Sequence, residues 1–261
     1  ARDLEVPIMV REYQHGYSDL HPGSTYDDGN RKQKAETMSR VLGDYYGADT
    51  LGALSVLDVG ASTGFIDEHL SHYFDSVAGI DIDEKAINHA VLAFKRENLS
   101  FAVGDAMALD YQENVFDIVI CSHVYEHVPD ADVMMSEIFR VLKPGGICYL
   151  SAGNRFNIIE PHHKLPFLSV IPKPLAHIYM RLAGKGGHYY ETHRSYWGLR
   201  KMVENFSVND YTAKLVKCPD KFGTAYMIPE GSRKQRFAIK MLEYAYWLMP
   251  GYIWLLKKPR L

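Results

Sequence analysis

The sequence predicts a doubly wound α/β sheet. Strand-like and helix-like segments alternate five times within about 100 residues, a glycine-rich turn follows the first strand, and acidic residues follow several strands. The strand-like segments are short apolar runs, which is typical of parallel strands buried on both faces. The carboxyl ends of such strands meet at one edge of the sheet, and this edge is where we expect a ligand site.

Each element of this sheet is marked by a change in hydrophobic period. The first helix is expected at 28–47, where apolar or small residues recur at helical spacing and Gly47 can end the helix. The alternation that follows predicts strands at 54–59, 77–82, 100–103, 115–121 and 147–152, with helices at 65–73, 86–94 and 133–142.

The chain changes character after Asn154. Four prolines between 161 and 174 exclude a long helix until residues 175–184, so this segment is expected to be an insertion or lid. Helical spacing resumes at 196–203, and 206–215 is strand-like. The expected organisation is a helical cap at 1–49, the ligand-binding core at 50–153, an inserted recognition segment at 154–194, and the rest of the sheet with C-terminal helices at 195–261.

Residues 237–256 are strongly apolar, with 16 apolar residues in 20. Lys240, Glu243 and the Pro250–Gly251 break argue against a membrane span, so a hairpin of helices is expected here. The basic end that follows suits peripheral contact with an anionic membrane. Packing against the sheet and a homodimer contact remain the alternatives.

Composition excludes several classes of protein. The chain is 47% hydrophobic and 23% charged, unlike collagen, disordered chains or coiled coils. Three scattered cysteines exclude a disulfide framework and a cysteine-based zinc site, which favours a reducing, cytoplasmic setting, and no segment resembles a signal peptide. Net charge is −14 over residues 1–154 and +11 over 155–261, so the second part is the one expected to meet an anion. The alternative is that the two sets of charges pair with each other across the fold.

The strongest local motif is VLDVGASTGFI at 56–66. It predicts a strand that delivers Asp58, followed by a turn in which Gly60 and Gly64 let the backbone approach a ligand closely. Ser62 stands where the dinucleotide-binding fingerprint requires its second glycine, so the turn is poorly suited to bind the pyrophosphate of a dinucleotide.

Two further acids follow the next strands. Asp81 ends the second strand, 21 residues after Gly60, and its two oxygens match the vicinal hydroxyls of a ribose. Asp83 directly precedes a helix and is the better N-cap, which leaves Asp81 for a ligand. Asp105 follows the third strand and can accept a hydrogen bond from an adenine amine, while Ala106 is placed to wall the ring.

The fourth strand ends in a polar cluster at the same edge. Its segment, FDIVICSHVYEHVPD, places Ser122, His123, Glu126 and His127 together at the rim. The order of the acids on the preceding strands fits one nucleoside lying across the point where the strand order reverses.

With these motifs in order, the chain resembles a class I S-adenosylmethionine-dependent methyltransferase of the small-molecule, type 11 kind, which has a Rossmann-like sheet. The resemblance covers residues 50–153 through VLDVGASTG, GIDID, GDAMAL, FDIVICSHVYEHVPD and FRVLKPGGICYLS. The family's middle glycine is replaced by Ser62, which is expected to narrow the turn slightly.

The resemblance implies S-adenosyl-L-methionine as cofactor. It implies that the turn residues contact the methionine part, Asp81 the ribose, Asp105 and Ala106 the adenine, and Ser122 and His123 the route to the methyl group. The helix at 28–47 would cover the cofactor, with Arg31 or Arg40 facing its carboxylate. The full cofactor-binding set is Asp58, Gly60, Ala61, Gly64, Asp81, Ile82, Asp105, Ala106, Ser122 and His123.

Methyl transfer to a hydroxyl needs orientation and a base for the departing proton. Imidazole titrates in the useful range, so His127 is the first candidate, with a purely structural role as the alternative, and His123 and His162 are the others. The insert is rich in histidine and basic residues, which suits an anionic acceptor. The expected acceptor-binding residues are Arg155, His162, His163, His193 and Arg194.

No metal site is predicted. Glu160 with His162 and His163, or Glu191 with His193, offers suitable ligand types. Neither set contains a helical i, i+4 pair or a CxxC partner, so the histidines are expected to act as donors to the acceptor.

These observations favour an O-methyltransferase of a small molecule. The insert and tail also resemble, more loosely, methyltransferases of cell-surface glycan biosynthesis. This likeness makes an anionic sugar or glycan intermediate the first candidate for the acceptor. A quinone or lipid acceptor is the alternative within the enzyme class, and a cofactor-binding protein without turnover is the alternative outside it. Nucleic acid is not expected as a partner because no aromatic platform accompanies the basic residues. The expected location is the cytoplasm, with contact at the inner face of the membrane if the tail binds lipid.

Overall fold

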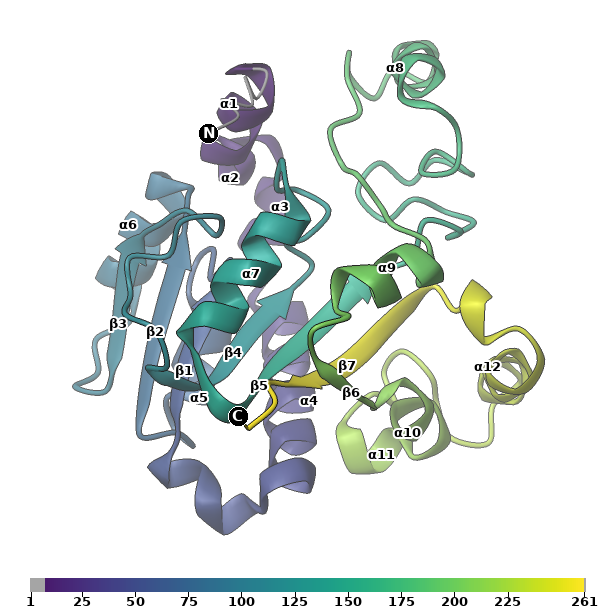
Figure 1. The fold of residues 1–261 in the computed structure, drawn as a ribbon. Coiled ribbons are helices and arrows are strands. Elements are labelled where there is room, and N and C mark those ends of the chain that lie inside the picture. Colours follow the sequence, from purple (N-terminus) through teal and green to yellow (C-terminus); the bar gives the residue numbers. More distant parts are fainter. Residues whose placement is uncertain (1–7, 261) are drawn as a thin grey trace.

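The computed structural model of the protein describes residues 8–260, without the side chains of residues 8–11 and 24. Its centre is a seven-stranded sheet of order β3-β2-β1-β4-β5-β7-β6 (Figure 1). The strands β1 to β5 are parallel to one another, whereas β7 is antiparallel to both β5 and β6. The order reverses between β1 and β4, as the predicted doubly wound Rossmann-like fold requires.

The strands are β1 (Ser55–Val59), β2 (Ser76–Asp81), β3 (Leu99–Val103), β4 (Phe116–Ser122), β5 (Leu142–Gly153), β6 (Ser207–Asp210) and β7 (Gly251–Lys257). The helices before β5 are α1 (Ile8–His15), α2 (Tyr17–Leu20), α3 (Pro22–Thr25), α4 (Asp28–Tyr46), the 3-10 helix η1 (Ala48–Ala53), α5 (Phe65–Leu70), α6 (Glu84–Ala93) and α7 (Ala131–Val141). Those after β5 are α8 (Lys173–Leu182), α9 (Tyr196–Met202), α10 (Thr212–Lys217), α11 (Pro219–Phe222), α12 (Arg233–Tyr244) and the 3-10 helix η2 (Tyr246–Leu248).

The two faces of the sheet are covered by different helices (Figure 1). On one face, α4 and α5 bury residues such as Met38 and Leu70 against Ile118 and Tyr149 of the sheet. On the other, α7 and α9 pack in a core that includes Met134 of α7. Because the central strands are covered twice, their apolar residues form continuous runs, which is why the sequence predicted them correctly.

Helix starts follow local capping chemistry. Asp27, Asp83 and Asp130 each precede a helix and accept a hydrogen bond from a backbone N–H of its first turn. The prediction that Asp83 caps its helix is therefore confirmed.

The C-terminal elements differ from the prediction. The segment expected to be a strand at 206–215 is a strand only over β6, after which Tyr211 turns the chain into α10. The expected hairpin of helices at 237–256 is wrong in its second half, because after α12 and η2 the chain enters β7 between β5 and β6. Trp254 and Leu255 are buried there, so the apolar run of β7 is explained by the sheet and is not available to a membrane.

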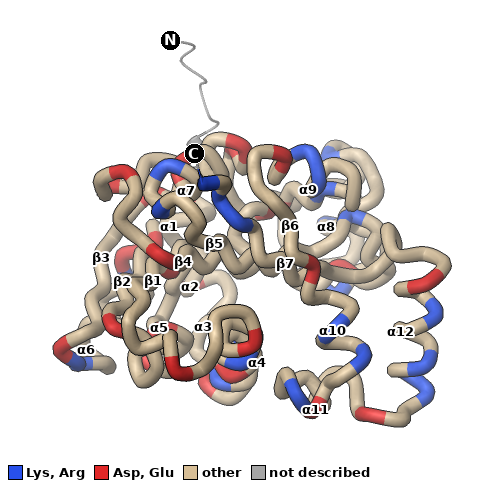
Figure 2. Tube along the Cα trace, turned by 60° about the horizontal axis from the view of Figure 1, so that its bottom comes forward, with Lys and Arg blue, Asp and Glu red and all other residues tan. Residues whose placement is uncertain are grey.

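The charged residues are distributed unevenly over the fold. Lys and Arg recur along α10 to α12, while Asp and Glu are frequent around α5 and α6 (Figure 2). Among residues 8–260, no helix combines the length and the apolar content that crossing a bilayer needs.

Candidate functional site

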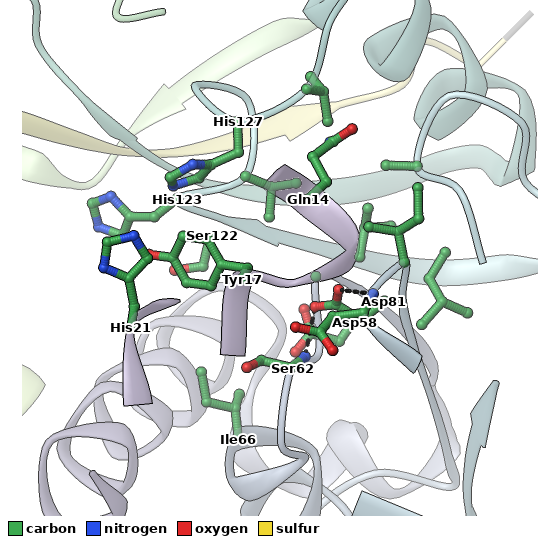
Figure 3. Close-up of a pocket in the computed structure, with 18 of the residues that line it drawn as sticks. Gln14, Tyr17, His21, Asp58, Ser62, Ile66, Asp81, Ser122, His123 and His127 are labelled. Atoms are coloured by element: carbon green, nitrogen blue, oxygen red, sulfur yellow. Dashed lines mark hydrogen bonds between the residues drawn. The ribbon is translucent and has the colours of Figure 1, made fainter. Parts of the chain in front are cut away.

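A cavity of about 510 Å³ lies at the carboxyl ends of the parallel strands. This volume is within the range of about 300–1,000 Å³ that is usual for small-molecule sites. Its walls come from the loops after β1, β2, β3 and β4, from the N-terminal helices and from the segment after β5. Acidic side chains gather at one end and histidines at the other (Figure 3).

The turn after β1 forms the floor of the acidic end. Gly60 has φ +89°, and a Cβ atom built on it would lie 2.5 Å from Cγ2 of Val124. Ser62 also has a left-handed backbone, with φ +52°, and its N–H donates to Asp81 Oδ2 at 2.9 Å. The serine that replaces the family's glycine therefore occupies a conformation that glycine adopts more easily.

Ala61 and Gly64 of the same turn do not line the cavity. Ala61 is buried against Gly79, and Gly64 lies where a Cβ atom would come within 2.8 Å of Ala90 and 2.7 Å of Phe101. Gly64 thus allows α5 to begin close to its neighbours, and the cavity itself is bordered by Gly60 and Ser62.

Asp58 and Asp81 face the same space (Figure 3). Asp81 accepts backbone N–H groups on both oxygens, from Ser62 at 2.9 Å and from Asp83 at 3.0 Å. Burial, together with the charge of Asp81, raises the pKa of Asp58 to about 7, although Arg31 opposes the shift. A cationic ligand would offset the repulsion between these carboxylates, and a hydroxylated ligand would donate hydrogen bonds to them.

The walls beyond Asp81 include the other predicted residues of this end. Ile82, Asp105 and Ala106 all line the cavity, and Asp105 Oδ1 accepts the N–H of Met107 at 2.9 Å. Asp83 also borders the cavity, but one of its oxygens caps α6 and the other accepts the N–H of Ser18.

Arg31 and Arg40 of α4 have different surroundings. Arg31 lines the cavity and donates to Ser62 Oγ at 3.2 Å. Arg40 pairs with Glu36 of the same helix and donates to the carbonyl of Asp220 in α11. Of the two arginines suggested by the sequence, only Arg31 borders the cavity.

The loop after β4 carries the first histidines. Ser122, His123 and His127 line the cavity (Figure 3). Both ring nitrogens of His123 are engaged, with Glu126 Oε1 at 3.3 Å and with Ser151 Oγ at 3.1 Å. His123 also has φ +58°, a strained backbone of the kind that is often found at functional sites.

His127 differs from His123 because its ring nitrogens are unpaired. No hydrogen bond joins either of them to another residue within 8–260, and Nδ1 is buried. Burial lowers the pKa of His127 to about 4, despite the opposing charge of Glu126, so the ring is neutral near pH 7.

The insert contributes His162, which lines the cavity beside Pro161 and Lys164. Glu160 holds His162 Nδ1 at 2.7 Å from Oε1. Burial alone would lower the pKa of His162, but the hydrogen bond and charge of Glu160 raise it overall.

The other predicted acceptor-binding residues do not line the cavity. Arg155 donates to the carbonyls of Ser169 and Val170, and Arg194 forms a two-pronged ion pair with Asp132. His163 and His193 lie behind the wall, where they contact Glu191 and Glu160.

The N-terminal helices supply residues that sequence reasoning missed. Tyr13, Gln14, Tyr17, His21 and the α4 residues Asn30 and Lys34 line the cavity. A helical cap was predicted over 1–49, but within it only the helix at 28–47 was given residues that face the cofactor. The short helices α1 to α3 carry no motif that marks them, since their role depends on where the chain folds back over the sheet.

In sequence, this chain matches a methyltransferase domain family and individual methyltransferases. Residues 57–150 match the methyltransferase domain family. The chain is 34% identical over 147 residues to a demethylmenaquinone methyltransferase of Lactococcus lactis, an alignment that covers 53% of this chain and 56% of that protein. It is 33% identical over 111 residues to a ubiquinone biosynthesis O-methyltransferase of Psychrobacter cryohalolentis, covering 40% and 43%. The chain thus matches about half the length of these relatives.

The fold has solved counterparts as well. The magnesium protoporphyrin IX methyltransferase of Synechocystis, solved with bound S-adenosylhomocysteine, aligns with a TM-score of 0.57 over 96% of this chain and 99% of that one. The sequence identity is 18%, so this likeness bears on the fold.

Proposed function

We propose, on the premise that residues 57–150 form a class I S-adenosylmethionine-dependent methyltransferase domain, that this chain is an O-methyltransferase of a small molecule. Its cofactor is S-adenosylmethionine. The observation that carries the proposal is that one cavity holds buried carboxylates at the glycine turn and, at its other end, a histidine whose ring forms no hydrogen bond with residues 8–260.

The acidic end fits the cofactor. Asp81 would accept the ribose hydroxyls, and Asp105 with Ala106 would border the adenine. Asp58 and Arg31 would meet the amine and carboxylate of the methionine part, because opposite charges attract more strongly where both side chains are largely buried. When bound, S-adenosylmethionine supplies a methyl group on a cationic sulfur, which is transferred in line to a nucleophile and leaves a neutral thioether.

His127 is the proposed base. Its ring borders the cavity and makes no hydrogen bond with the described residues, so it has a lone pair to offer to a proton. As the acceptor oxygen forms its bond to the methyl carbon, the hydroxyl proton passes to His127. His123 has both nitrogens engaged and is better suited to hold the loop after β4 in place.

The acceptor end favours a planar hydroxylated ring. Tyr13, Tyr17, His21 and His127 surround it, and Tyr13 stacks on Tyr190 with ring centroids 4.3 Å apart. A quinol-like acceptor would pack against these rings. The likeness to a demethylmenaquinone methyltransferase and to a ubiquinone biosynthesis O-methyltransferase supports the same acceptor class.

An anionic sugar is the second candidate. Lys164 borders this end and is exposed, so it can meet a carboxylate or phosphate. Arg155 and Arg194, which the sequence suggested for this task, are held by other partners, and this weakens the candidate.

The proposal is tested by the release of S-adenosylhomocysteine from S-adenosylmethionine with two acceptor sets, simple quinols and sugar acids. We expect turnover with the quinols. Asp81→Asn should raise the Kd of the cofactor about tenfold or more, because a hydrogen bond to a charged group is worth about 1.5–3 kcal/mol. His127→Ala should leave that Kd nearly unchanged and lower kcat about 100-fold or more.

His188→Ala is the matched control, since His188 is an exposed histidine of the same insert. It should match the wild type in both measurements. Full activity of His127→Ala would remove His127 as the base. Unchanged cofactor affinity of Asp81→Asn would remove the ribose assignment, and cofactor binding without turnover on either set would favour a binding protein.

A further inference from the structure

Behind the histidine end of the cavity lies a buried cluster of carboxylates and imidazoles. Glu126, Glu160 and Glu191 have fully buried side chains, and they come from the loop after β4, from the insert and from the segment before α9. The histidines around them are His123, His162, His163 and His193.

No lysine or arginine of residues 8–260 forms an ion pair with these carboxylates; the ammonium of Lys173 donates to backbone carbonyls, including that of Glu191, and acts on Glu160 and Glu191 only through space. Within residues 8–260, every ion-pair partner of the three buried carboxylates is a histidine, which is cationic only when protonated. Three buried carboxylates are costly unless cations offset them. A divalent cation would do so without requiring several protonated imidazoles side by side.

Glu160, His162 and His193 already have the arrangement of a ligand set. Oε1 of Glu160 is 2.7 Å from Nδ1 of His162 and 3.4 Å from Nε2 of His193, and one donor atom from each residue lies within 4.8 Å of the others. Around a tetrahedral zinc ion, donors at about 2.0–2.2 Å lie roughly 3.3 Å apart. Small side-chain shifts would therefore open room for an ion.

The surroundings orient these donors. The backbone N–H of His163 donates to Glu160 Oε2 at 2.6 Å, which leaves Oε1 facing the two imidazoles. Nδ1 of His193 and Oε2 of Glu126 are buried and form no hydrogen bond with the part of the chain that the structure describes, and both residues border Gly153. If His193 carries its proton on Nδ1, Nε2 is free to bind a metal and Glu126 is the nearby acceptor, an arrangement common around metal-bound histidines.

We propose that Glu160, His162 and His193 bind a divalent transition-metal ion of the zinc class. Two imidazoles and one carboxylate suit this class better than magnesium or calcium, which prefer oxygen ligands. Because His162 lines the cavity, the ion ties the insert and the segment before α9 to the acceptor end. The sequence offered Glu160 with His162 and His163, and Glu191 with His193, as separate sets. The fold combines members of both.

Metal binding is measured directly, so the test is independent of methyl transfer. Chelator-treated, dialysed protein is titrated with ZnCl2 by calorimetry, and bound zinc is counted after gel filtration. We expect one zinc per chain for the wild type and for His188→Ala. Glu160→Gln and His162→Ala should each lose this stoichiometric zinc. The melting temperature of the wild type should rise with zinc and that of Glu160→Gln should not.

His162 also belongs to a second set, with Glu126 and His127. The His127→Ala variant distinguishes the two ligand sets, because it removes a member of the second set only, and it should still bind one zinc. Loss of zinc in His127→Ala with retention in Glu160→Gln would overturn the ligand assignment. A variant that misfolds would also lose zinc, so the wild type is tested separately with cobalt. A four-coordinate Co²⁺ ion bound by nitrogen and oxygen ligands gives intense visible absorption bands. Absence of stoichiometric zinc and of these bands in the wild type would overturn the site.

Discussion

At the scale of single residues, the turn after β1 shows how much depends on backbone conformation. Gly60 and Ser62 are both left-handed, yet only one of them is a glycine. The Ser62 N–H donates to Asp81 and its hydroxyl accepts from Arg31, so the serine joins the turn to two residues of the acidic end. These contacts help to hold a conformation that costs a non-glycine residue about 1–2 kcal/mol.

Gly60→Ala tests this turn. The added Cβ would meet Val124 at 2.5 Å and would impose a side chain on φ +89°. We expect a loss of roughly 2 kcal/mol or more in the free energy of unfolding, together with weaker cofactor binding, measured by urea denaturation and calorimetry.

Gly187→Ala is the control for that substitution. Gly187 lies in the insert, where an added Cβ has no neighbour within 4 Å. It should change stability by less than about 0.5 kcal/mol. Equal stability of the two variants would show that the turn after β1 tolerates a side chain.

Individual site residues differed in how well the sequence predicted them. Asp58 and Asp81 lie at the carboxyl ends of their strands, and Asp105 and His127 follow theirs, so the rule that strand ends share an edge placed them together. Tyr13 reached the cavity without any such signal, because its position depends on how the N-terminal helices return over the sheet.

At the scale of elements, β7 illustrates why a long apolar run is ambiguous. Its residues are aromatic, aliphatic and buried on both faces, which looks like a buried helix when period alone is considered. Seven register pairs with β5 and four with β6 make this segment a strand. It is apolar on both sides because Trp254 packs into the core on one face of the sheet and Leu255 into the core on the other. Such long-range pairing leaves no local trace in the sequence.

Asp44 links elements that are distant in the chain. It lies near the end of α4, accepts from Tyr211 at 2.9 Å and Lys214 at 3.1 Å, and pairs with Lys221. The hydrogen bond from Lys221 is the main reason that the pKa of Asp44 falls to about 2, and burial opposes it.

The pH dependence of stability tests this link. Because the folded pKa lies below the unfolded value of about 3.9, the contribution of Asp44 is complete above pH 4 to 5 and is lost as the pH falls toward 2. We expect Asp44→Asn to lower the free energy of unfolding by about 1 kcal/mol at pH 7 and by little near pH 2. Asp49 is exposed, so Asp49→Asn serves as the control and should leave the free energy of unfolding unchanged at either pH. If Asp44→Asn lowers the free energy of unfolding equally at pH 7 and pH 2, the link is not ionic.

At the scale of the whole molecule, the cavity joins two chemically different groups of residues. The parallel sheet supplies the acids, and the loops and insert supply the histidines. The sequence predicted the sheet and its acidic end well because periodicity and strand order determine both. It predicted the acceptor end less well, since Arg155 and Arg194 find partners in the fold that no spacing rule reveals.

The most direct test of this account is calorimetry of the purified chain with adenosyl ligands. We expect saturable heat with S-adenosylmethionine and with S-adenosylhomocysteine, and none with a nicotinamide or flavin dinucleotide. If neither adenosyl ligand gave binding heat while a dinucleotide bound tightly, the assignment of the acidic end and the function that rests on it would be contradicted.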